Sequence, residues 1–157
     1  MAPMIFARAI LSGDPIKIFN NGNMSRSFTY IEDIIEIIFK LINNPALPDK
    51  NFDRTNPNPS TSWNSHRIFN LGNEKPTNLI DFIETLEFEI GIKANRIYEN
   101  MQPGDVQHTT SDCSLIKDWV GMVPKTSLKD GIRIFINWYK DCLLYTSPSP
   151  ETIDDLV

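Results

Sequence analysis

The apolar residues of this chain repeat at three- and four-residue intervals in several stretches, which is the spacing of helices that bury one face. Short runs rich in β-branched residues separate these stretches and predict strands. The predicted helices cover residues 1–11, 31–42, 79–90, 114–120 and 127–141, and the predicted strands or extended runs cover residues 16–19, 25–30, 67–71 and 95–101. Because strands alternate with helices, the expected fold class is α/β, with few short strands and several helices.

The clearest helix signal begins at Thr29. Thr29 and Glu32 have the spacing of a capping box, in which the two side chains accept the first free N–H groups of a helix. The apolar positions from Ile31 to Ile42 surround most of this helix, so we expect it to be buried on more than one side. The helix over residues 1–11 has no capping residue, which leads us to expect that its beginning is missing.

Residues 45–66 are polar, contain four prolines and follow no periodic pattern. A loop of this length without secondary structure is unusual inside a compact domain. Two interpretations are open: an excursion over the protein surface, or a loop that binds a partner.

Composition narrows the class of protein. The chain is 41% hydrophobic and 22% charged, with a net charge of −5, as in an ordinary soluble globular domain. The acidic balance argues against a nucleic-acid partner. No stretch is long and apolar enough to cross a bilayer, and Arg8 interrupts the first apolar segment, unlike a signal peptide. Cys113 and Cys142 form no metal-binding pattern and are interpreted as free thiols in a reducing compartment.

Few residues suggest chemistry by themselves. The sequence shows no glycine-rich dinucleotide turn, no phosphate-binding P-loop and no nucleophile elbow, so no catalytic, cofactor-binding or metal-ligating residue is predicted. Arg26 could present its planar guanidinium to a phosphate, or it is a plain surface arginine. Phe19 could stack on a base or pack in the core. Residues 102–105 form a turn that offers the carboxylate of Asp105, and a purely structural turn is the alternative.

Four segments taken together, residues 1–34, 67–87, 101–106 and 124–141, resemble the C-terminal half of NAD-dependent UDP-glucuronate 4-epimerases. These enzymes are extended short-chain dehydrogenases/reductases. The element Gly-x-x-x-Arg-x-Phe-x-Tyr-Ile is shared by nucleotide-sugar epimerases, dehydratases and decarboxylases. The combination of Ala-Pro-Met with Met-Gln-Pro-Gly-Asp is more particular to the glucuronate epimerases.

The resemblance implies a UDP-sugar-binding part over residues 1–141, which is the C-terminal substrate-binding part of the family's fold. The Rossmann half that binds NAD, with the catalytic Tyr-x-x-x-Lys, is expected to be missing. Residues 142–157 are interpreted as a non-native or disordered tail, because residues 142–150 look like the translation of a transposon end from library preparation. A genuine flexible tail is the alternative.

The resemblance also assigns roles to a nucleotide-binding strand end and turn. Arg26 matches the family's arginine that grips the nucleotide diphosphate, and Phe19, with the backbone at Lys17, matches the strand end where the uracil sits. Ser27 stands where the family usually has an aspartate beside this arginine, which is expected to loosen the grip on the diphosphate.

Two further turns carry the remaining assignments. Asn73 follows the Asn-x-Gly strand and lies near the nucleotide in relatives. Gln102 and Asp105 match positions that close over the ribose and the diphosphate.

The implied function is interconversion of UDP-glucuronate and UDP-galacturonate by transient NAD-dependent oxidation at C4. This chain would supply UDP-sugar binding only and be inactive alone. Two alternatives stay open: part of a nucleotide-sugar dehydratase or decarboxylase, and a stand-alone, non-catalytic UDP-sugar-binding module. The resemblance further implies a cytoplasmic enzyme of capsular polysaccharide biosynthesis that is a homodimer at full length.

Overall fold

The computed structural model describes residues 2–146 and divides the chain into two compact units. Of the described residues, unit 1 comprises 2–22, 80–101 and 127–146, and unit 2 comprises 23–79 and 102–126. Each unit is therefore assembled from segments that are far apart in the sequence. With five helices and few strands in the described range, the structure confirms the predicted α/β class.

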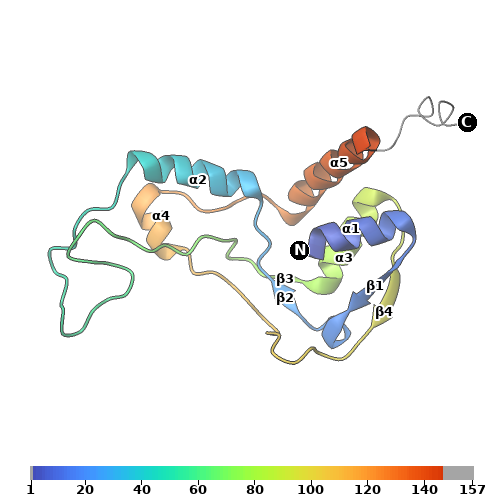
Figure 1. Ribbon diagram of the computed structural model, residues 1–157, viewed down its shortest axis with the longest axis horizontal. Coiled ribbons are helices and arrows are strands. Elements are labelled where there is room, and N and C mark those ends of the chain that lie inside the picture. Colours follow the sequence, from blue (N-terminus) through green and yellow to red (C-terminus); the bar gives the residue numbers. More distant parts are fainter. Residues whose placement is uncertain (1, 147–157) are drawn as a thin grey trace, which may run out of the picture. The chain divides into compact units, whose positions relative to one another are not determined.

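Unit 1 is built on a pair of parallel strands. Its elements are α1 (Ala2–Ser12), β1 (Pro15–Ile18), the 3-10 turn η1 (Phe19–Gly22), α3 (Leu79–Ile90), β4 (Asn95–Tyr98) and α5 (Leu128–Thr146). Strands β1 and β4 lie side by side, with Ile16 opposite Arg96 and Ile18 opposite Tyr98 (Figure 1). Apolar side chains from α1, α3, α5 and β1 are buried, and the rings of Phe6 and Phe82 lie 6.3 Å apart.

The turn after β1 has an unusual backbone. Asn20 and Asn21 have φ angles of 51° and 50°, and Gly22 follows with a φ of 82°. Asparagine and glycine are the residues that tolerate this left-handed region best, which explains the Asn-Asn-Gly sequence. The strand predicted over residues 16–19 therefore ends one residue earlier, because Phe19 begins the turn.

Unit 2 surrounds a short central strand. Its elements are β2 (Ser25–Arg26), α2 (Ile31–Asn43), β3 (Thr77–Asn78) and α4 (Ser114–Val120). Strand β2 pairs antiparallel with β3, and the Ser25 carbonyl and N–H bond to Thr109 and Gln107 on its other side. Helices α2 and α4 contact each other around the buried side chains of Ile37, Cys113 and Ile116.

The predicted capping box at Thr29 is wrong. Helix α2 begins at Ile31 with Tyr30 as its N-cap residue and has no side-chain cap. The Thr29 hydroxyl instead accepts a hydrogen bond from the backbone N–H of Asn73, at 2.9 Å. The Thr29 hydroxyl, which local spacing assigned to the start of the helix, therefore bonds to a distant segment of the chain.

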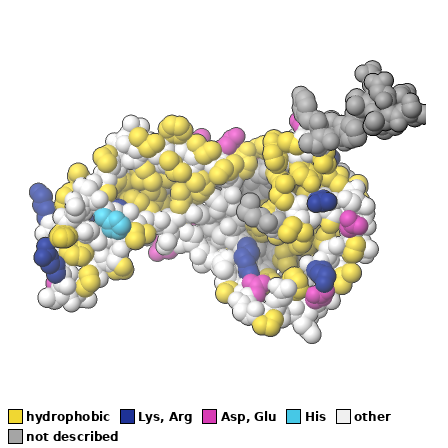
Figure 2. All heavy atoms as spheres, in the orientation of Figure 1, with side chains coloured by type: hydrophobic (Ala, Val, Ile, Leu, Met, Phe, Trp, Pro, Cys, Tyr) yellow, Lys and Arg dark blue, Asp and Glu magenta, His cyan; other side chains and the backbone are white. Residues whose placement is uncertain are grey.

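The expectation that α2 is buried on more than one side is also wrong for the described chain. Only Asp33 and Ile37 of this helix are buried, because α4 covers a single face. Figure 2 shows apolar side chains gathered over this region, and the exposed ones include Ile31, Ile35, Ile38, Phe39 and Ile42. The surface of α2 is thus strongly apolar.

The segment predicted as a strand over residues 67–71 forms no ladder. Arg67 makes an isolated bridge with Thr61, and the N–H of Ile68 donates to the Ser60 carbonyl. The preceding loop, residues 45–66, contains no helix or strand, as predicted. Side chains such as Asp49, Asp53 and Asn58 accept N–H groups two residues further on, so the loop satisfies part of its backbone locally.

The last helix begins as predicted and continues further. The Ser127 hydroxyl accepts the N–H of Asp130 at 3.1 Å, which caps the start of α5. The helix runs past Asp141 to Thr146, and residues 147–157 lie outside the described residues. The division at residue 141 stays a prediction. No helix within the described range is long and apolar enough to span a membrane.

Candidate functional site

Arg26 is the most strongly positioned of the predicted site residues. It ends β2, and its Nη1 donates to the carbonyl oxygens of Ser25 and Gln107 at 2.8 and 3.1 Å. Its Nη2 donates to Oδ1 of Asp105 at 2.8 Å. The side chains of Arg26 and Asp105 are 31% and 34% exposed, so the ion pair is half-buried and remains accessible.

The turn that carries Asp105 has the predicted form. The N–H of Asp105 donates to the carbonyl of Gln102 at 3.2 Å, and Gly104 has a φ of 83°. Asp105 Oδ1 also accepts the N–H of Val106 at 2.8 Å, which fixes the carboxylate. Gln102 is exposed, and its backbone closes the turn.

The ion pair between Arg26 and Asp105 bears on the expected effect of Ser27. The sequence led us to expect that loss of the neighbouring aspartate loosens the arginine, yet Asp105 supplies a carboxylate from another segment. The Ser27 hydroxyl donates to the Thr109 carbonyl at 3.3 Å. The contact between Arg26 and Asp105 spans 79 positions, and no local pattern in the sequence could have revealed it.

A second polar turn in unit 2 presents Asn73. Its N–H donates to the Thr29 hydroxyl, and its Oδ1 accepts the N–H of Lys75 at 3.0 Å. The preceding residue, Gly72, exchanges two hydrogen bonds with the buried thiol of Cys113, which donates to the Gly72 carbonyl at 3.0 Å and accepts its N–H at 3.3 Å. The backbone at Asn73 is therefore held from both sides, and sequence reasoning missed both Thr29 and Cys113.

Cys113 and Cys142 are free thiols in the structure. His108 is a further titratable residue near the site. It is exposed, but its Nδ1 shares a hydrogen bond of 2.9 Å with the hydroxyl of buried Ser25. His108 thus lies beside β2, next to the residue that precedes Arg26.

Phe19 and Lys17 lie in unit 1. Phe19 is half-buried at the end of β1, in the left-handed turn. The Lys17 ammonium pairs with Glu99 at 2.8 Å, and the N–H of Glu99 donates to the Ile18 carbonyl at 2.9 Å. The structure therefore groups Lys17 with Phe19 in one unit, and Arg26 with Asp105, Gln102 and Asn73 in the other.

The described residues do not fit NAD. A dinucleotide site uses a glycine-rich turn that leads from a strand directly into a helix N-terminus. Strand β1 leads into the turn Phe19–Gly22, and the next element of the chain is β2, while no helix within the described range directly follows β4. No step through NAD is therefore assigned to this chain. Within residues 2–146, no group of His, Cys, Asp and Glu gathers to hold a metal ion either.

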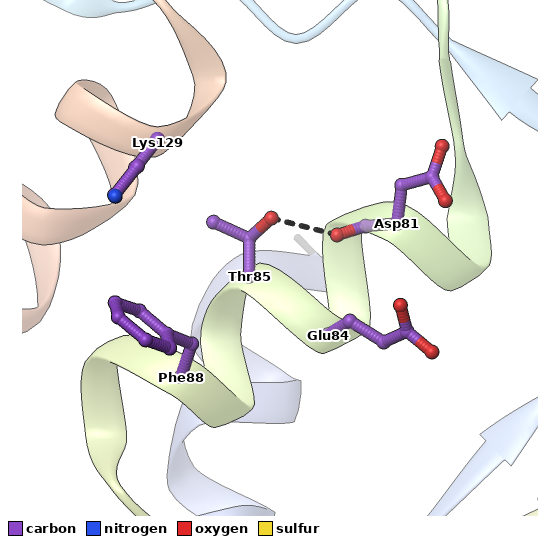
Figure 3. Close-up of a pocket in the computed structure, with 5 residues that line it drawn as sticks. All are labelled: Asp81, Glu84, Thr85, Phe88 and Lys129. Carbon is purple, nitrogen blue, oxygen red and sulfur yellow. Dashed lines mark hydrogen bonds between the residues drawn. The ribbon is translucent and has the colours of Figure 1, made fainter.

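A separate open hollow lies between α3 and α5 of unit 1 (Figure 3). Phe88 and Lys129 form one side, with the Lys129 ammonium 5.2 Å from the ring centroid. The Thr85 hydroxyl donates back to the Asp81 carbonyl at 2.7 Å, so it is used within α3. The hollow contains none of the site residues predicted from the sequence, and its acidic lining is unsuited to a diphosphate.

Comparison with known proteins gives one consistent family. The NAD dependent epimerase/dehydratase family matches residues 2–56. The chain is 36% identical to Protein CapI of Staphylococcus aureus over 139 residues, which is 88% of this chain and 42% of that protein. It is 33% identical to UDP-glucuronate 4-epimerase 4 of Arabidopsis thaliana over 143 residues, which is 88% of this chain and 32% of that protein.

Solved structures agree on the fold. The UDP-glucuronic acid 4-epimerase of Bacillus cereus in complex with UDP-glucuronic acid and NAD superimposes with a TM-score of 0.71 at 24% identity, covering 90% of this chain and 40% of that one. The chain therefore spans well under half the length of these relatives. Residues 2–56 match the model of the NAD dependent epimerase/dehydratase family, and nine-tenths of the chain is similar to a partial region of UDP-glucuronate 4-epimerases and related nucleotide-sugar enzymes.

Proposed function

We propose that this chain binds the UDP portion of a UDP-sugar, with Arg26 gripping the diphosphate. The observation that carries the proposal is the guanidinium of Arg26, which is oriented by three hydrogen bonds while the side chain stays 31% exposed. An arginine that is fixed in advance and open to solvent suits a phosphate, because little side-chain freedom is left to lose on binding.

The other residues predicted for the site are assigned supporting parts in nucleotide binding. We propose that Asn73 and Gln102, which belong to the same unit as Arg26, contribute from their turns, whereas the uracil roles of Phe19 and of the backbone at Lys17 stay predictions from the sequence. The immobilised backbone at Asn73 supports its part. The groups of unit 2 bind and orient the nucleotide.

We further propose that the reaction served is the interconversion of UDP-glucuronate and UDP-galacturonate. The names of the Arabidopsis thaliana and Bacillus cereus relatives support this sugar class, and the similarity to Protein CapI is compatible with capsule synthesis. NAD would supply the oxidation and reduction at C4 when it is bound in the whole enzyme. A homodimer and a cytoplasmic location stay predictions from the sequence.

The contribution of this chain is to affinity rather than to the chemical step. Contacts with the UDP portion are similar in the ground state and in the transition state, so they lower KM more than they raise kcat. Because its residues do not fit NAD, the chain alone is proposed not to convert UDP-glucuronate. A chromatographic assay with added NAD should therefore show no UDP-galacturonate, and sustained turnover by the purified chain would contradict this.

The proposed binding is tested by calorimetric titration of UDP into the purified chain. Arg26→Ala should weaken UDP binding by about 1.5–3 kcal/mol, the usual value of a hydrogen bond to a charged group, which corresponds to about ten- to 150-fold. Arg8→Ala is the matched control, because this exposed arginine on α1 lies outside the proposed site. Equal losses in both variants, or no binding by the wild-type chain, would refute the proposal.

A further inference from the structure

The carboxylate of Asp105 contacts Arg26 directly, whereas the family resemblance places this position over the ribose and the diphosphate. We propose that Asp105 is a positioning residue, which holds the Arg26 guanidinium so that its remaining N–H groups converge on one phosphate group. This inference rests on the proposed function, because it concerns how Arg26 meets the diphosphate.

The donor groups of Arg26 are unevenly used. Nη1 donates to the carbonyl oxygens of Ser25 and Gln107, and Nη2 donates to Asp105. Among contacts with the described residues, this leaves Nε–H and one N–H of Nη2 for a ligand. Two donors on one planar group match the two oxygens of a single phosphate, so the protein's own contacts decide which part of the guanidinium is presented.

The turn over residues 102–105 fixes the Asp105 carboxylate where it contacts Arg26. Its Oδ1 accepts from Arg26 and from the Val106 N–H, both at 2.8 Å, while its own N–H closes the turn onto Gln102. Gly104, with a φ of 83°, gives the turn a backbone conformation that side-chain-bearing residues rarely adopt. The carboxylate oxygen that meets Arg26 is therefore committed to two partners within the protein.

The negative charge of Asp105 distinguishes positioning of Arg26 from direct contact with the ligand. A carboxylate close to a diphosphate repels it, so Asp105 helps UDP binding only through the orientation that it gives to Arg26. A residue that instead accepts ribose hydroxyls would help uridine and UDP alike. Uridine, which lacks phosphate, thus distinguishes the two roles.

The experiment titrates UDP and uridine into the wild-type chain and into variants, followed by NMR. Asp105→Ala should weaken UDP binding by about three- to tenfold, from the freedom regained by one long side chain, and should leave uridine binding unchanged. In an Arg26→Ala background the same substitution should cause no further loss. Asp53→Ala is the charge-matched control, since the Asp53 carboxylate accepts hydrogen bonds from Thr55 of its own loop.

Asp105→Asn provides a test if the alanine variant fails to fold. Its amide oxygen can still accept from Arg26 while the negative charge is gone, so UDP binding should stay within twofold of wild type or become tighter, and uridine binding should not change. Weaker uridine binding in either variant, additive losses in the double variant, or UDP binding by Asp105→Ala that equals or exceeds wild type would overturn the inference. A wild-type chain that binds no UDP would instead refute the proposed function, and this inference with it.

Discussion

Glu87 allows the energetics of unit 1 to be tested quantitatively. Its side chain is 1% exposed, and its carboxylate accepts hydrogen bonds from Lys93, Arg96 and the N–H of Ala94 at 2.7–3.1 Å. These contacts tie the end of α3 to the start of β4. Because the buried carboxylate has several donors, it stabilises the fold only while it remains charged.

Glu87→Ala should lower the free energy of unfolding by about 2–4 kcal/mol. The Ala94 N–H loses a buried acceptor, which costs about 1–3 kcal/mol, and the Arg96 side chain, only 21% exposed, loses its main counter-charge. Lys93 is almost fully exposed and recovers its hydration, which keeps the total below the cost of a wholly buried pair. Urea denaturation followed by circular dichroism measures the difference.

Glu84→Ala is the matched control. Glu84 lies on the same helix, but it is 57% exposed and its carboxylate is 4.0 Å from Arg96. A surface pair of this kind is worth at most about 1 kcal/mol, and the substitution should cost less than that. If both alanine variants lose the same free energy of unfolding, the reasoning about buried donors is refuted.

The same carboxylate gives a pH dependence with a defined sign. Burial by itself would raise the pKa of Glu87, but hydrogen bonds from Lys93, Arg96 and Ala94 outweigh it, so the pKa lies below the ordinary 4.5. A lowered folded-state pKa means that the unfolded chain binds the proton first as pH falls. The stabilisation is therefore complete above about pH 4.5 and is lost below it, and Glu87→Gln should flatten this part of the pH profile.

Two further substitutions test the architecture of each unit by urea denaturation. Asp33→Ala should cost about 2–4 kcal/mol in unit 2, because the buried carboxylate accepts three hydrogen bonds from residues 125–126, and a loss under 1 kcal/mol would contradict that account. Gly22→Ala should destabilise more than Gly91→Ala, by about 1 kcal/mol or more: both have a positive φ, but only at Gly22 does an added Cβ meet Ile80, at 2.6 Å. Equal losses at the two glycines would show that Ile80 moves aside freely.

Local patterns predicted the helices well and the strands less well. The helix over residues 79–90 and the helix over residues 114–120 match the observed α3 and α4, because their apolar periodicity and the glycines that follow them are contained in the segments themselves. Residues 67–71 have the composition of a strand, but a ladder needs a partner of matching register, and only an isolated bridge at Arg67 forms.

The candidate site shows the same limit. The Gln102–Asp105 turn follows from its proline and glycine, whereas the contact of Asp105 with Arg26 depends on how distant segments meet. The spacing of Thr29 and Glu32 suits a helix cap, yet in the fold the Thr29 hydroxyl accepts a hydrogen bond from the N–H of Asn73 instead. The sequence thus indicated which residues could take part in binding, but it could not show which of them contact one another.

The central claim is that UDP binds at Arg26, and the most direct test is the 1H–15N spectrum of the isotopically labelled chain during UDP titration. The account predicts saturable shifts at the Arg26 side chain and at the backbone amides of Asn73 and Asp105, and their absence in Arg26→Ala. Saturable shifts confined to the hollow beside Phe88, or a spectrum that does not respond to UDP, would contradict it.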